Sequence, residues 1–189
     1  MTLAFAAVVL AGGSARRLGG VDKLGLAVGG RSMLDRTLDA VAGADPVVVV
    51  GPRRDTAAEV VWAREDPPGG GPLAGLSAGL HVLPEGVELV AVLAGDQPHL
   101  TSATVMRLLG AIGSANGAVL TDADGMPQWL LGVWRVPALR SAMPAQVRNL
   151  SARAVFKELG PVHVPVVGAE ASDVDTPEDL HRARTRNRS

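Results

Sequence analysis

The chain has no cysteine, only four histidines and almost no net charge, and each of these scarcities excludes a class of protein. Without cysteine there are no disulfides and no thiolate chemistry, and four histidines leave little for a zinc site. A formal charge of −1 over 189 residues provides no general attraction to nucleic acid or to a membrane surface. The chain also lacks any run of 18 uninterrupted apolar residues, so we expect no membrane-spanning helix.

What the chain does have is the composition of an ordinary globular protein. Apolar residues make up 47% of it and charged residues 20%, and its length is sufficient to bury a substantial core. The first apolar run lacks a basic flank and leads into glycines and arginines, which is unlike a signal peptide. We therefore expect a cytoplasmic protein, monomeric or weakly homo-oligomeric, with one domain over residues 1–186 and a frayed basic tail at 187–189.

Short apolar runs alternate with helical patterns along the chain. The runs that predict strands are Ala4–Leu10, Val47–Val50, Val60–Ala63, Val87–Leu93, Ala118–Thr121, Leu130–Trp134 and Val162–Val166. Several are continuous rather than alternating, which favours strands buried on both faces of a mainly parallel sheet. The order predicts an α/β protein, a three-layer α/β/α sandwich of the Rossmann-like type, with ligands at the carboxyl ends of the strands.

Helix starts are readable at three places. Ser32 and Thr101 each precede apolar residues at helical spacing, and Thr176 followed by Pro177 predicts a third start near the end of the chain. Gly29 and Gly30 predict the turn of a short hairpin. The later prolines, among them Pro137, interrupt the alternation, so we expect the second half to be more irregular and to hold the second substrate.

The most informative stretch is the loop after the first predicted strand. Ala11, Gly12 and Gly13 allow backbone N–H groups to approach a ligand closely. Arg17 and Lys23 add cations to the same loop. A strand that leads into a glycine-rich, cationic loop is suited to holding a polyphosphate, although the spacing matches no Walker-type or dinucleotide-binding loop. A flexible turn with solvated arginines is the alternative.

Acidic residues follow two of the predicted elements. Asp96 comes directly after the run Val87–Leu93, where it would point into the crevice in which open α/β sheets bind ligands. Asp173 and Asp175 are two residues apart, so in extended chain both point to one side. Carboxylate oxygens are ligands that Mg²⁺ prefers. The alternatives are an Asx-type turn at Asp96 and a helix cap at Asp173.

The loop resembles the signature of the nucleotidyltransferases that include molybdenum cofactor guanylyltransferase. That signature begins L-A-G-G and continues to an Arg and a Lys, for which this chain has Arg17 and Lys23, while Ala15 and Leu18 depart from it. Three later segments resemble motifs of the family, in the same order, and these are Gly71–Gly75, which we expect to be a loop, Gly95–Pro98 and Asp173–Pro177. The resemblance covers nearly the whole chain and implies the sheet of nucleotide-diphospho-sugar transferases.

The resemblance also implies roles for individual residues. Arg17, Lys23 and Asp96 would be catalytic, and Asp96 with Asp175 would bind Mg²⁺. The residues implied to bind the nucleotide are Leu10, Ala11, Gly12, Gly13, Lys23, Asp66, Gly75 and Asp96. The carboxylate of Asp66 could accept the N1–H and N2–H donors of guanine. Arg148 and Arg153 lie in a segment that resembles the region contacting the pterin phosphate, although an exposed basic helix face explains them equally well.

These expectations describe a Mg²⁺-dependent enzyme that transfers GMP from GTP to the phosphate of molybdopterin, or of a related acceptor, and releases pyrophosphate. One departure from the family bears on the base, because Gly51 stands where the family has an Asn after the second strand. CTP therefore remains an alternative donor. A nucleotide-binding protein without turnover is the alternative from a different class.

Overall fold

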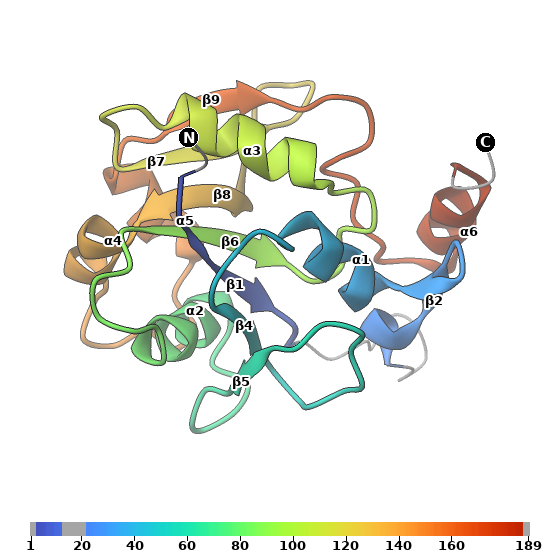
Figure 1. Ribbon diagram of the computed structural model, residues 1–189, viewed down its shortest axis with the longest axis horizontal. Helices are drawn as coiled ribbons and strands as arrows, with labels where there is room; N and C mark the ends of the chain where they lie inside the picture. The colour runs from blue at the N-terminus through green and yellow to red at the C-terminus, as the bar shows by residue number, and fades with distance from the viewer. Residues whose placement is uncertain (1–2, 13–21, 187–189) are drawn as a thin grey trace.

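The structure is a computed structural model, which describes residues 3–12 and 22–186. Its centre is a seven-stranded sheet with the order β5-β4-β1-β6-β8-β7-β9 (Figure 1). The strands are β1 Ala6–Leu10, β4 Val47–Val50, β5 Val61–Ala63, β6 Leu89–Ala94, β7 Gly117–Thr121, β8 Pro127–Arg135 and β9 Val162–Pro165. β8 is antiparallel to β6 and β7, and the other pairs are parallel. The seven predicted strands and the mainly parallel sheet are confirmed.

Helices cover both faces of this sheet, as the alternation of elements predicts. One face is covered by α1 Met33–Ala40 and α3 Ser102–Ala111, and the other by α2 Pro72–His81, α4 Val136–Ala142 and α5 Ala152–Glu158. The strands β1, β4, β6 and β7 are almost completely buried, so an apolar core lies on each side of the sheet, while the edge strands β5 and β9 are partly exposed. In the part of the chain that the structure describes, no helix combines the length and apolarity needed to cross a bilayer.

A smaller group of elements lies beyond the sheet. It contains the 3₁₀ helix η2 Lys23–Gly25, the hairpin β2 Ala27–Val28 and β3 Arg31–Ser32, and the last helix, α6 Pro177–Arg186. Figure 1 shows α6 beside β2, away from the strands of the central sheet. Val28, Met33, Val174 and Ala183 form a separate small core there. In this core, Val174 and Ala183 from the last part of the chain pack against Val28 and Met33 from the first part.

The three predicted helix starts are confirmed by their capping bonds. The Ser32 hydroxyl accepts the backbone N–H of Asp35 at 3.0 Å, and Thr101 forms a capping box with Thr104. At α6 the Asp179 N–H donates to the Thr176 hydroxyl at 3.2 Å, while the Asp179 carboxylate accepts the Thr176 N–H at 2.8 Å. Each cap satisfies backbone donors that the first turn of a helix leaves unpaired.

Two expectations about the chain after β5 are wrong. Gly71–Gly75 is not a loop, because α2 begins at Pro72 with Gly71 as its N-cap. Proline at the first helical position has the correct φ, and Leu73, Leu76 and Leu80 then bury at helical spacing against the sheet. The second half is also more regular than expected. Pro137 lies in the first turn of α4, where it begins a helix rather than interrupting one.

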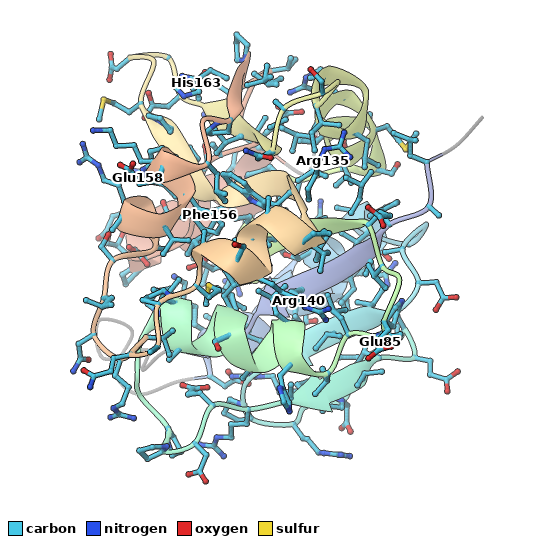
Figure 2. All side chains as sticks on the ribbon, turned by 90° about the vertical axis from the view of Figure 1, so that its left-hand side faces the viewer. Glu85, Arg135, Arg140, Phe156, Glu158 and His163 are labelled. Carbon is cyan, nitrogen blue, oxygen red and sulfur yellow. The ribbon has the colours of Figure 1, made fainter. Side chains whose placement is uncertain are left out.

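The face covered by α2, α4 and α5 is built around one aromatic pair. Trp134 of β8 stacks on Phe156 of α5, with ring centroids 4.2 Å apart, and both side chains are fully buried. Figure 2 shows Arg140 between α4 and α2. One of its guanidinium nitrogens donates to the carbonyl oxygens of Leu80 and Leu83 at 3.0 and 3.2 Å. Arg140 thereby satisfies carbonyl groups at the end of α2.

Candidate active site

The carboxyl ends of β1 and β6 lie side by side, and the candidate site is built from this edge of the sheet. The Gly95 N–H donates to the Leu10 carbonyl at 3.0 Å, which extends the strand pairing by one residue. A Cβ at Gly95 would lie 3.2 Å from both the Leu10 carbonyl oxygen and a methyl carbon of Leu24, so the close approach favours glycine. The buried Thr37 hydroxyl lies 3.3 Å from the Gly95 carbonyl oxygen. These contacts hold the turn that carries Asp96.

Lys23 joins this turn to the end of the chain. Its Nζ donates to Asp96 Oδ2 at 2.7 Å and to Asp175 Oδ1 at 2.6 Å. The lysine side chain is 15% exposed, against 26% and 44% for the two aspartates. Leu24, the next residue, is buried in the core and anchors the short helix from which Lys23 projects. Three residues distant in sequence therefore meet at one point.

Asp175 reaches Lys23 because the residue before it is buried. Val174 packs with Val28, Met33 and Ala183 and is almost completely inaccessible. Neighbouring side chains in extended backbone point to opposite sides, which leaves Asp173 and Asp175 facing away from that core. The alternative reading of Asp173 as the helix cap is wrong, because Thr176 and Asp179 form the cap.

The cluster has more negative than positive charge among the described residues. Burial alone would lower the pKa of Lys23, but hydrogen bonds and charge from Asp175 and Asp96 outweigh it and raise this pKa. Partial desolvation, together with the negative charges of Asp175 and Asp96, raises the pKa of Asp173. One ammonium group therefore faces three carboxyl groups. A second cation would relieve the repulsion among them.

The donor set suits a hard divalent cation. Asp96 and Asp175 supply carboxylate oxygens on either side of a cationic nitrogen, and Mg²⁺ is usually bound by one or two carboxylates together with substrate phosphates and water. Among the described residues, no three acidic or histidine side chains are close enough together to form a complete metal site. A divalent ion would thus need Lys23 to move aside and a ligand to supply further oxygens.

Two other predicted residues line one cavity. A cavity of about 560 Å³ lies at the end of β5, beside α2, and its lining includes Asp66 and Arg148. One guanidinium nitrogen of Arg148 donates to the Pro67 carbonyl at 2.8 Å, which ties the two segments together. Arg64 and Arg140 add positive charge to the lining. Arg153, in contrast, is exposed on α5 and lies outside the lining of this cavity.

Four of the other predicted residues, Leu10, Ala11, Gly12 and Gly75, lie in or near the end of β1. The Ala11 N–H already donates to the Val50 carbonyl at 2.8 Å, so the sheet uses this donor. Gly75 is buried in α2, where a Cβ would lie 3.4 Å from Leu10 and 3.6 Å from Val50, so here it serves close packing. Gly12 is described, whereas the expectations for Gly13 and Arg17 lie outside the described residues. The roles of these residues in binding stay predictions.

Gly51 explains the absence of the family's Asn in this chain. Its φ is +151°, and a Cβ there would lie 2.6 Å from the Ala11 carbonyl oxygen. Residues with side chains rarely adopt this conformation, and the contact would be far too short. The backbones at the ends of β1 and β4 therefore touch, and an Asn could not fit without moving one of them.

Sequence reasoning missed Arg54 and Asp22. Arg54 follows β4, and its guanidinium contacts both the Asp22 carboxylate and the Ala11 carbonyl oxygen. The available signal was a cation shortly after a predicted strand, at the edge where ligands bind. The contact of Arg54 with Ala11 depends on the pairing of β4 with β1, which the sequence does not reveal.

Comparisons with known proteins agree with this arrangement. The family described as "MobA-like NTP transferase domain" matches residues 7–163. The chain is thus a nucleotidyltransferase. It is 36% identical over 144 residues to a probable molybdenum cofactor guanylyltransferase of Opitutus terrae, covering 74% of this chain and 70% of the relative. It is 31% identical over 197 residues to a molybdenum cofactor guanylyltransferase of Bradyrhizobium sp., covering 96% and 92%. The chain belongs to the MobA-like NTP transferase family.

Solved structures show the same fold. Molybdopterin-guanine dinucleotide biosynthesis protein A of Archaeoglobus fulgidus aligns with a TM-score of 0.73 at 21% identity, over 96% of this chain and 98% of the other. A 2-C-methyl-D-erythritol 4-phosphate cytidylyltransferase of Thermus thermophilus aligns at 0.75 and 21%, over 99% and 100%. A Mycobacterium tuberculosis protein solved as a manganese complex aligns at 0.69 and 22%, over 98% and 100%. At these identities the likeness concerns the fold alone.

Proposed function

We propose that this chain transfers GMP from GTP to the terminal phosphate of molybdopterin, or of a closely related pterin, and releases pyrophosphate. The observation that carries the proposal is the meeting of Lys23, Asp96 and Asp175 at the carboxyl edge of the sheet. The names of the two relatives, both guanylyltransferases acting on molybdenum cofactor, support this donor and acceptor.

The proposed reaction needs alignment and charge neutralisation more than acid–base catalysis. An oxygen of the acceptor phosphate forms a bond to the α-phosphorus of GTP, and the bond from that phosphorus to the bridging oxygen breaks. Pyrophosphate leaves with the electron pair. A phosphate monoester with a second pKa of about 6 is already largely dianionic at neutral pH, so its attack requires no general base. The site has to hold two anions close together and stabilise the departing one.

Lys23 is the residue proposed to stabilise the leaving group. In this role its ammonium moves from the two carboxylates to the β- and γ-phosphates, with Arg17 as a second cation. Asp96 and Asp175 would then hold Mg²⁺, whose contribution is to neutralise charge on the triphosphate. The partial exposure of Asp96 and Asp175 is compatible with such an exchange of partners.

We propose that the guanine base and the acceptor phosphate bind to side chains that line the cavity near β5. Asp66 would accept hydrogen bonds from the guanine edge, and Arg148 would contact the acceptor phosphate. Leu10, Ala11, Gly12, Gly13 and Gly75 are proposed to line the nucleotide through their backbones. The same transfer with CTP is a second candidate, favoured by Gly51, since the backbone there excludes an Asn that could help to recognise a purine.

A thermal-shift panel tests the donor. GTP, CTP, ATP and UTP are each added with and without Mg²⁺, and the melting temperature of the protein is recorded. A ligand at a hundred times its Kd stabilises by about 2.7 kcal/mol. We expect a Mg²⁺-dependent shift with GTP, whereas a shift with CTP alone would replace the guanylyl assignment. Release of pyrophosphate only when a molybdopterin acceptor is present distinguishes an enzyme from a nucleotide-binding protein.

A further inference from the structure

We infer that Arg54 is a positioning residue for nucleotidyl transfer, whose guanidinium joins the end of β1 to the segment that presents Lys23. The inference rests on the proposed role of Lys23 in phosphate binding. It concerns a residue that follows β4 and belongs to none of the family-like motifs in the sequence.

Every nitrogen of the Arg54 guanidinium is engaged with the protein. Nε donates to Asp22 Oδ2 at 2.8 Å and to Oδ1 at 3.0 Å, and Nη2 donates to Oδ1 at 2.8 Å. Nη1 donates to the carbonyl oxygens of Ala11 and Pro52, each at 3.0 Å. The side chain is only 16% exposed, although it belongs to a loop. Arg54 is therefore held in place and has little capacity left to bind a phosphate itself.

Its partners occupy two key places in the chain. Ala11 directly follows β1, and Asp22 directly precedes Lys23, so the two stand on either side of the glycine-rich stretch of the sequence. Gly51 makes the connection possible, because the close approach of its backbone to Ala11 brings the loop after β4 within reach. Arg54 thus fixes the position of the segment that begins at Lys23 relative to the end of β1, beside which Gly12 lies.

Lysine could not do the same in this position. A guanidinium offers several donors in a rigid plane, which here serve a carboxylate and two carbonyl groups at once. An ammonium group is a compact charge that could pair with Asp22 but could not span all three acceptors. Isolated exposed ion pairs contribute little, so the value of Arg54 lies in this bridging geometry.

The test measures the Kd of magnesium-bound GTP, CTP, ATP and UTP by calorimetry for the full chain and its variants. We expect R54A to weaken binding of the preferred triphosphate about tenfold or more, with KM rising more than kcat falls, and R54K to recover only part of the affinity. In a D22N background, R54A should change Kd less than threefold, because the bridge is already broken. R31A, which breaks the exposed Arg31–Asp39 pair at 2.8 Å, is the matched control and should bind normally.

The melting temperature of each variant without nucleotide separates positioning from stability. If R54A lowers this temperature but binds the triphosphate with wild-type affinity, Arg54 is merely structural and the inference is overturned. Independent, additive effects of R54A and D22N on Kd would overturn it as well. If the wild-type chain binds none of the four triphosphates, the proposed function fails first, and the inference falls with it.

Discussion

Two clusters of charged side chains tie distant segments of this protein together, and they differ in how well their charges are matched. At the first, within the part of the chain that the structure describes, Lys23 faces Asp96, Asp173 and Asp175. At the second, Arg107 of α3 meets Glu170, which follows β9, with two bonds of 2.6 and 3.0 Å. The Thr104 hydroxyl and the Val167 N–H also donate to Glu170, at 2.6 and 2.8 Å.

The balance of charge separates a structural contact from a candidate catalytic one. Burial alone would raise the pKa of Glu170, but Arg107, Thr104 and the Val167 N–H outweigh it and lower this pKa. Both oxygens of that carboxylate accept hydrogen bonds and its charge is paired with Arg107, so the cluster holds the fold together. Among the described residues, the Lys23 cluster has more acidic than basic groups, and the neighbouring charges of Asp175 and Asp96 help to raise the pKa of Asp173. Such mismatches are typical of functional sites, where a ligand supplies the missing charge.

The largest expected effect is loss of turnover on changing Lys23. K23M keeps the length of the side chain but removes its charge, so nothing stabilises the departing pyrophosphate from this position. We expect kcat to fall about 100- to 1,000-fold, as for other single groups that stabilise transition-state charge. Pyrophosphate release from GTP and acceptor measures it, with R31A as a control that should stay near wild type. Turnover within threefold of wild type in K23M would refute the proposed role.

The second effect concerns the Arg107–Glu170 cluster. It should appear in the free energy of unfolding rather than in turnover. E170A leaves Arg107 and Thr104 without their shared partner, and we expect unfolding to become easier by about 2–3 kcal/mol. Urea denaturation measures this change, and activity per folded molecule should remain. D39A, at the exposed Arg31–Asp39 pair, should cost less than about 1 kcal/mol. Equal losses in the two variants would mean that the Arg107–Glu170 cluster holds the fold together no better than an exposed ion pair does.

The third effect is on binding of a divalent ion without nucleotide. Because the Lys23 ammonium lies between the carboxylates of Asp96 and Asp175, it competes with a metal ion for them. We expect K23M to bind Mn²⁺ about tenfold more tightly than the wild type, since removing a nearby positive charge favours a second cation. Electron paramagnetic resonance of free Mn²⁺ measures the affinity, and D175N should weaken it. Weaker Mn²⁺ binding by K23M would contradict the competition.

The smallest effect is a dependence of stability on pH at Asp173. The folded protein raises the pKa of this carboxyl above its unfolded value of about 3.9, so its ionisation opposes folding. Relative to high pH, the protein is more stable below the unfolded pKa, where Asp173 is neutral. This extra stability is lost as the pH rises through the pKa of the folded state. D173N should therefore raise the melting temperature by about 1–3 °C at pH 7, and by less near pH 3.

D124N, in the exposed turn between β7 and β8, is the control for that measurement. It should leave the melting temperature unchanged at both pH values. A D173N variant that is less stable than the wild type at pH 7 without added metal would show that Asp173 is not repelled by its neighbours.

Much of the fold could be predicted because strands and helix starts leave local signals. Continuous runs such as Val47–Val50 indicated buried parallel strands, and Ser32, Thr101 and Thr176 marked helix starts by their capping chemistry. The helices that were missed have weaker signals. α4 and α5 have seven residues each, and both α2 and α4 begin with a proline, which is also typical of a loop, as expected for Gly71–Gly75, or of an interruption, as expected at Pro137.

The sequence by itself determined which residues we propose for the chemistry and which edge of the sheet they follow, because these depend on local pattern and residue type. Only the tertiary structure decided which of them meet. Strand order brought Arg54 to Ala11 and Asp22, and burial of Val174 turned Asp175 toward Lys23. Contacts of this kind depend on how separate segments share one core, and no local pattern in the chain encodes that.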